Sequence, residues 1–149
     1  MYSRRAVLRS GGVGLAAVLA GCSGSPAEET STDAATATQT RTPSEVRVDM
    51  TDDLKFDPQT VTIAVGDTVV WETTGAVAHS ATAYEADLPD GATYFASGEF
   101  ESEAAARSSY PDGSVGTGET YSHTFETAGE FPYFCVPHES GMKGTVVVE

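Results

Sequence analysis

The chain has 149 residues, with 22 acidic and 8 basic side chains and a formal net charge of −14. Such acidity excludes nucleic acid as a partner, because the phosphate backbone binds basic surfaces. It also destabilises a compact fold by self-repulsion unless salt screens it, and at 1 M salt the Debye length falls to about 3 Å. We therefore expect a high-salt setting. An acidic protein that docks a basic partner is the alternative.

The first 21 residues are predicted to be an export signal. Arg4 and Arg5 precede a weakly apolar run that is too short to span a bilayer. The twin arginine resembles signals of the Tat route. Residues 19–22 (LAGC) resemble a lipobox, so we expect cleavage before Cys22 and a lipid on its thiol. The protein would then sit on the outer face of the cell membrane. An uncleaved amphipathic anchor is the alternative.

Residues 22–44 are rich in Ser, Thr, Ala and Glu and contain almost no large apolar side chain. Such a segment cannot bury enough surface to fold, so it is predicted to be a flexible tether. Without the signal the chain keeps five basic residues against 22 acidic ones. Residues 45–149 are predicted to form the folded domain.

Alternating polar and apolar residues predict strands in this domain. The predicted strands are 45–50, 60–65, 68–72, 119–125, 129–134 and 145–148. In the second of them Val61, Ile63 and Val65 are expected to point inward. Gly66 and Asp67 fit a tight hairpin connection to the third. The pattern favours an all-β, Greek-key β-sandwich.

Residues 84–118 interrupt the strand pattern and are predicted to be a long connection that covers one sheet edge. Within it, residues 101–107 favour a short helix through three consecutive alanines. Five apolar side chains are expected to pin this connection to the sheet: Tyr84, Leu88, Tyr94, Phe95 and Phe100.

One short loop near the end carries a thiol, an imidazole and a thioether: Cys135, His138 and Met142. Cys135 ends a predicted strand, Pro137 bends the chain so that His138 turns back, and Gly141 relaxes the backbone before Met142. A further imidazole, His79, is expected to come from another strand. Two His, one Cys and one Met are the ligand set of a blue-copper electron-transfer site.

The motif Tyr-Phe-Cys-x-Pro-His-x-x-x-Met-x-Gly, at residues 133–144, resembles the plastocyanin-type cupredoxins, and the domain most resembles the halocyanins of halophilic archaea. The resemblance carries copper-ligand roles onto His79, Cys135, His138 and Met142. The chain departs from the family in two places. The loop between His138 and Met142 is one residue shorter than usual, and Ser80 stands where the family often has Asn, a residue that ties the two ligand loops together.

The residues leave several alternatives open. The two cysteines of an exported protein could form a disulfide, and Cys with His could hold zinc, although structural zinc rarely uses Met. A copper store or delivery protein is a further alternative. A copper oxidase or nitrite-reducing domain would need further histidine-rich centres, whereas this chain has three histidines. The third, His123, lies on the apolar face of an alternating strand and is interpreted as structural.

The resemblance implies a one-electron carrier, not an enzyme, with one copper ion and redox proteins at the membrane as partners. His138 is expected to lie nearest the surface, so that electrons pass through its edge. Val136, Pro137, Gly141 and Met142 would form an apolar rim around it. In high salt this rim, rather than charge, would select the partner. We expect a monomer.

Overall fold

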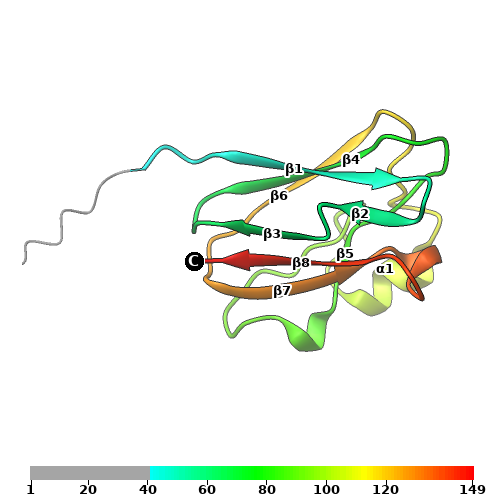
Figure 1. Ribbon diagram of the computed structural model, residues 1–149. Helices are drawn as coiled ribbons and strands as arrows, with labels where there is room; N and C mark the ends of the chain where they lie inside the picture. The colour runs from blue at the N-terminus through cyan, green and yellow to red at the C-terminus, as the bar shows by residue number, and fades with distance from the viewer. Residues whose placement is uncertain (1–40) are drawn as a thin grey trace, which may run out of the picture. The chain divides into compact units, whose positions relative to one another are not determined.

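Two four-stranded sheets form the fold (Figure 1). The first has the order β2 (Lys55–Asp57), β1 (Glu45–Thr51), β4 (Thr68–Thr73), β6 (Thr120–Thr124), and the second has the order β3 (Thr60–Ile63), β8 (Lys143–Val148), β7 (Gly129–Phe134), β5 (Thr82–Ala83). Strands β1 and β4 are parallel, as are β3 and β8, whereas the other neighbours are antiparallel. The predicted all-β sandwich is confirmed.

This computed structural model describes residues 41–149. The predicted export signal, Cys22 and most of the predicted tether lie outside the described residues. Within the described part, no helix is long and apolar enough to cross a membrane.

Aromatic side chains fill the space between the sheets. Trp71 on β4 is wholly buried. Its ring centroid lies 5.5 Å from that of Phe95, 5.6 Å from Tyr121 and 5.3 Å from Tyr133. The inward face of β4 follows from its strict alternation of buried and half-buried residues. The indole ring of Trp71 therefore packs against side chains of both sheets and of the long connection.

The predicted hairpin at Gly66 and Asp67 is wrong, because β3 and β4 belong to different sheets. Asp67 is buried, and its carboxylate accepts hydrogen bonds from the backbone N–H groups of Ser44 (2.7 Å) and Ala64 (3.0 Å). Gly66 has φ +90°, a conformation that glycine adopts at no steric cost. The chain thus leaves one sheet for the other here. Val65 lies beyond the end of β3 and is 44% exposed, so its predicted inward position is also wrong.

Asp67 gives this corner a pH dependence. The Ser44 N–H, followed by the Arg41 guanidinium, holds the pKa of the carboxyl well below its usual value of 3.8. A depressed folded-state pKa stabilises the fold above the unfolded pKa, and this stabilisation disappears as the pH falls through the folded value. We expect Asp67→Asn to lower the melting temperature at pH 7, with a gap to the wild type that narrows progressively as the pH falls below about 4. Thermal melts from pH 7 to pH 2 measure this, and a gap that is constant with pH would contradict it.

The connection between β5 and β6 folds over one edge of the second sheet. It contains a short 3-10 turn at Glu85–Asp87 and helix α1 at Glu103–Ser109. The helix begins two residues later than predicted, because the Ser102 hydroxyl caps it by accepting the N–H of Ala105 at 3.2 Å. Phe95 is buried, and Leu88 and Tyr94 pack against the core, as expected. Phe100 and Tyr84 are half-buried.

Candidate metal centre

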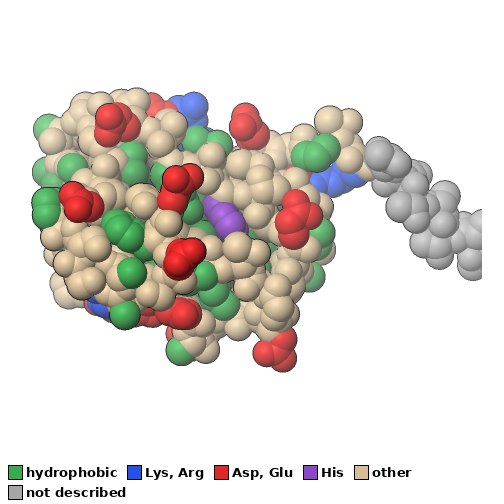
Figure 2. Space-filling model, turned by 180° about the vertical axis from the view of Figure 1, so that it is seen from behind, with side chains coloured by type: hydrophobic (Ala, Val, Ile, Leu, Met, Phe, Trp, Pro, Cys, Tyr) green, Lys and Arg blue, Asp and Glu red, His purple; other side chains and the backbone are tan. Residues whose placement is uncertain are grey.

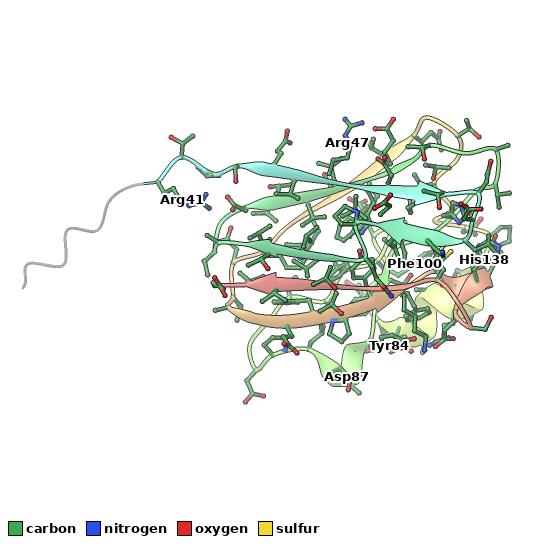
Figure 3. The ribbon with its side chains drawn as sticks, in the orientation of Figure 1. Arg41, Arg47, Tyr84, Asp87, Phe100 and His138 are labelled. Atoms are coloured by element: carbon green, nitrogen blue, oxygen red, sulfur yellow. The ribbon has the colours of Figure 1, made fainter. Side chains whose placement is uncertain are left out.

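Three side chains that can hold a metal converge at one end of the sandwich: His79, Cys135 and His138. Their donor atoms all lie within 4.8 Å of one another. The Sγ atom of Cys135 is 3.8 Å from Nδ1 of His79 and 3.5 Å from Nδ1 of His138. His79 and Cys135 are wholly buried, whereas His138 is only partly buried. Figure 3 shows His138 at the tip of the sandwich.

The end of β7 positions Cys135 and His138. The strand ends at Phe134, and a 3-10 turn over Val136–His138 follows, with Pro137 near its start. Proline has its φ preset for such a turn. The N–H of His138 bonds the carbonyl of Cys135 at 3.0 Å, which brings the imidazole back beside the thiol. The predicted bend at Pro137 is present.

His79 reaches the metal centre from a separate segment of the chain, although it does not belong to a regular strand. It forms a single β-bridge with Val115, at the far end of the long connection. The two residues exchange both backbone hydrogen bonds, at 3.1 and 2.7 Å. The connection therefore fixes the upstream histidine, a role that its irregular sequence did not reveal.

Met142 closes the ligand loop. Its N–H bonds the carbonyl of His138 at 2.8 Å, and its carbonyl accepts the N–H of Cys135 at 3.1 Å. Its side chain is wholly buried, so it contributes nothing to the predicted apolar rim. The expected use of glycine freedom at Gly141 is wrong, because its φ is not positive and a Cβ there would meet nothing within 4 Å.

Ser80 connects the two ligand segments, as its position after His79 suggested. Its hydroxyl accepts the N–H of Val136 at 2.8 Å, and its own N–H donates to Sγ of Cys135 at 3.3 Å. Ser80 is buried, so this link lies inside the protein. One residue thus holds both the loop that follows the thiol and the thiol itself.

We expect Ser80→Ala to lower the free energy of unfolding by about 1 to 3 kcal/mol, because the N–H of Val136 loses its acceptor. The backbone N–H that reaches Sγ would remain, so the visible spectrum of the copper-loaded protein should keep its bands. Urea titrations and absorption spectra measure the two effects. The matched control is Ser122→Ala at an exposed position of β6. Equal stability of the two variants would show that the link contributes nothing.

Burial sets the protonation of the donors. It raises the pKa of the Cys135 thiol, against the weaker effect of the hydrogen bond from the Ser80 N–H. Burial, and then the nearby His138, lowers the pKa of His79. A neutral imidazole is the form that binds a metal, whereas the thiol must lose a proton when it does. Metal uptake by these residues therefore releases a proton.

The donor spacing fits a metal ion. Bonds of about 2.0 Å to nitrogen and 2.3 Å to sulfur, arranged in a trigonal plane, place the donors roughly 3.5 to 3.8 Å apart. The two sulfur–nitrogen distances are 3.5 and 3.8 Å. The spacing alone also suits zinc. A thiolate, an imidazole and a buried thioether in one loop, with a second imidazole from another segment, are typical of copper.

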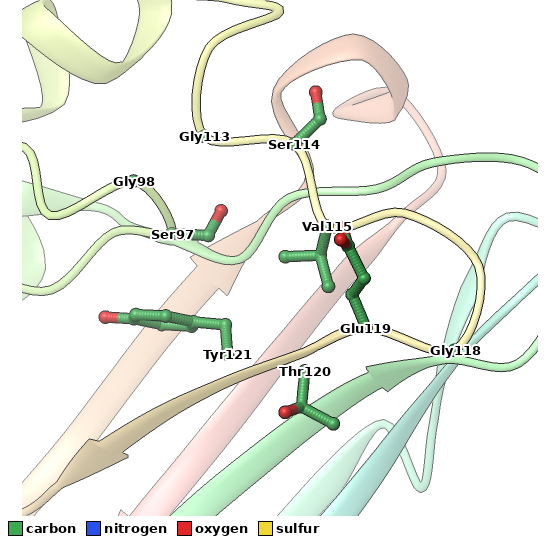
Figure 4. Close-up of a pocket in the computed structure, with 9 residues that line it drawn as sticks. All are labelled: Ser97, Gly98, Gly113, Ser114, Val115, Gly118, Glu119, Thr120 and Tyr121. Carbon is green, nitrogen blue, oxygen red and sulfur yellow. The ribbon is translucent and has the colours of Figure 1, made fainter.

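The metal centre is separate from a cavity of about 540 Å³ between the long connection and the start of β6. Figure 4 shows this cavity, where Gly98 and Gly113 lie opposite β6. None of its nine lining residues is a candidate ligand, although one of them, Val115, pairs with His79.

His123 is also separate from the metal centre: its ring stacks on Phe95 with centroids 4.9 Å apart. This packing supports its interpretation as a structural histidine.

A β-sandwich with a Cys and two His at one end defines the class of the cupredoxins. The chain belongs to the plastocyanin/azurin family of copper-binding proteins, whose family model matches residues 43–149. Membership of this family establishes copper as the cofactor and confirms the predicted resemblance.

Known proteins agree with this assignment. The chain is 38% identical over 97 residues to a plastocyanin of Scenedesmus fuscus, a match that covers 64% of this chain and 88% of that protein. It is 35% identical over 95 residues to a halocyanin of Natronomonas pharaonis, covering 63% of this chain and 48% of that protein. The chain thus spans about half the length of the halocyanin.

Solved structures show the same fold. A reduced amicyanin variant has a TM-score of 0.52 and 27% identity, with 70% of this chain and 82% of that one covered. A copper-containing nitrite reductase from Thermus scotoductus has a TM-score of 0.53 and 25% identity, but only 22% of it is covered. The enzyme therefore shares one region of its chain with this protein, and most of it has no counterpart here.

Proposed function

We propose that this protein is a membrane-anchored one-electron carrier with one type 1 copper ion, held by His79, Cys135, His138 and Met142. The observation that carries the proposal is the convergence of three donors at one end of the sandwich, with only His138 reaching the surface. The bound copper would supply one-electron redox chemistry. The residues of the chain supply a fixed geometry, a dry environment and one exposed edge.

Rigid ligands suit electron transfer because little movement between oxidation states means a small reorganisation barrier. Here Ser80 fixes Cys135, Val115 fixes His79, and the hydrogen bonds of Met142 close the loop around His138. Of the three converging donors, His138 is the one whose side chain is only partly buried. We therefore place the electron portal at its edge.

The partners are proposed to be redox proteins at the membrane, which meet the end of the sandwich that carries His138. Pro137 and Gly141 are exposed there and Val136 is half-buried, so the rim is apolar. Elsewhere acidic side chains are scattered over the surface with few basic ones, as the face in Figure 2 shows.

The chain is proposed to divide into a signal (1–21), a tether (22–44) and a copper domain (45–149), with a lipid at Cys22. This division and the lipid rest on sequence features alone.

The test is to add Cu(II) to the full chain in molar salt and record visible and EPR spectra. An intense blue thiolate-to-copper band that bleaches with a reductant and returns on oxidation, without loss of copper, is the expected result. A pale band, or loss of copper on reduction, would instead support a storage or delivery protein. Catalysis is disfavoured because the only other histidine, His123, packs against Phe95.

A volume-conserving change tests whether Met142 is an axial ligand or only part of the core. Leucine fills similar space but cannot donate electrons to the metal. The loss of a donor destabilises Cu(II) more than Cu(I), so Met142→Leu should raise the reduction potential while the blue colour remains. Voltammetry measures the shift. An unchanged potential would show that Met142 is a core residue, and Met50→Leu, at a wholly buried core position outside the ligand loop, is the control.

A further inference from the structure

An ion-pair cluster links the long connection to the ligand loop. Arg107 on α1 donates two parallel hydrogen bonds to Glu139, from Nη1 to Oε2 at 2.6 Å and from Nη2 to Oε1 at 3.0 Å. Glu139 directly follows His138 in the sequence. The contact therefore joins the helix of the connection to the residue beside the candidate ligand.

Arg107 is itself held in place from two sides. Its Nε donates to Glu103 at 2.8 Å, one helical turn earlier. Its guanidinium also lies over the ring of Phe134, 4.1 Å from the centroid. Phe134 directly precedes Cys135. The planar group thus binds a carboxylate on each edge and packs its face on an aromatic ring, a geometry that lysine cannot reproduce.

Glu139 receives a third donor. The hydroxyl of Tyr84, from the start of the connection, donates to its Oε1 at 3.0 Å. The ring of Tyr84 packs on Phe134, with centroids 4.4 Å apart. In Figure 3 Tyr84 lies below the strands, toward the end of the sandwich where His138 is placed. Two separate segments of the connection therefore meet on one carboxylate.

A simple surface ion pair would account for the contact without any role in the site, because exposed pairs contribute little. Three observations distinguish this one. The Arg107 and Glu139 side chains are only 36% and 34% exposed. The contact is bidentate, which adds strength and fixes the angle. The pair also belongs to a network, because Arg107 donates to Glu103 as well and Glu139 also accepts from Tyr84.

We propose that Arg107 is a positioning residue, which acts through Glu139 to hold the loop that carries His138 and Met142. The loop's own hydrogen bonds close it upon itself, and Ser80 holds its first residue. The Arg107–Glu139 contact holds its middle, next to the imidazole. The inference rests on the proposed function, in that His138 is taken to be a ligand.

The two partners of the contact provide a sharp test. Arg107→Ala and Glu139→Gln change the net charge in opposite directions. A purely electrostatic effect on the site would therefore have opposite signs in the two variants, whereas a loss of positioning has the same sign in both. The double variant should be no worse than either single variant, because residues that act through one contact are not additive.

The first readout needs no metal. In the metal-free full chain, the amide hydrogen of Met142, which bonds His138, should exchange roughly tenfold faster in both single variants. The second readout is the electron self-exchange rate of the copper-loaded chain in molar salt, which should fall about tenfold in both. Arg107→Lys should resemble Arg107→Ala, because lysine keeps the charge but cannot donate two parallel hydrogen bonds to one carboxylate. The control is Arg47→Ala, which breaks the pair between the exposed Arg47 side chain (62% exposed) and Glu72, both in the first sheet rather than the sheet of the ligand loop, and which should change both rates less than about twofold.

Wild-type rates in Arg107→Ala, full rescue by Arg107→Lys, or opposite effects of Arg107→Ala and Glu139→Gln would each overturn the positioning role. If Arg107→Ala does not fold, the lysine and glutamine variants decide the question by the same rates. Absence of the blue band in the wild type would overturn the proposed function and this inference with it. A normal band with unaltered variant rates would overturn only the inference.

Discussion

Replacing Cys135 with serine should abolish the intense blue colour of the copper-loaded protein. The colour of such a site comes from charge transfer between a thiolate and copper, and serine offers no sulfur. Weak binding of Cu(II) to His79 and His138 would remain and give only a pale spectrum. The serine is nearly isosteric at a wholly buried position, so the fold itself should persist. Absorption spectra of wild type and variant, at equal copper content, give the comparison.

The chain offers a matched control for this experiment. It has two cysteines, and Cys22 is outside the described domain. Cys22→Ser should leave the colour unchanged. A disulfide between the two would occupy the Cys135 sulfur, so that the wild type would lack the blue band and Cys22→Ser would restore it. An intense blue band that survives in Cys135→Ser would contradict the ligand assignment outright.

Replacing Trp71 with alanine should give the largest loss of stability. The indole is wholly buried and its ring packs against four other aromatic rings. Large-to-small changes of this kind remove hydrophobic burial and leave a cavity, at a cost of about 3 to 5 kcal/mol. Urea unfolding of the metal-free protein in molar salt measures the change.

The control for Trp71→Ala is Val65→Ala, at a position that is 44% exposed. Its free energy of unfolding should stay within about 0.5 kcal/mol of the wild type. Similar losses in both variants would show that the aromatic core is not the main source of stability. A loss in Trp71→Ala below about 1 kcal/mol would mean that the neighbouring rings close the cavity.

The ligand loop could be predicted from the sequence because its chemistry is local. Cys135, His138 and Met142 lie on one short loop, and a thiol, an imidazole and a thioether at this spacing are typical of a blue-copper site. The strands could also be predicted from the sequence, because buried and more exposed residues alternate with period two in β1, β4 and β6. Even the link through Ser80 could be anticipated, since it depends on a residue adjacent to His79.

The remaining features depend on contacts that the sequence does not display. Gly66 and Asp67 have the composition of a hairpin, but the buried carboxylate of Asp67 redirects the chain into the other sheet. The two-residue strand β5 is too short to produce a pattern. Arg107 and Glu139 lie 32 residues apart, so no local signal connects them.

The seclusion of Cys135 has a consequence for the protein before it receives its metal. Oxidants and other disulfides react with exposed thiolates, whereas this sulfur is wholly buried and its raised pKa keeps it protonated. The thiol of the metal-free protein should therefore oxidise slowly in air, so that the protein keeps its capacity to bind copper. The same burial should make copper uptake slow, because His138 is the only one of the three donors that is exposed to solvent.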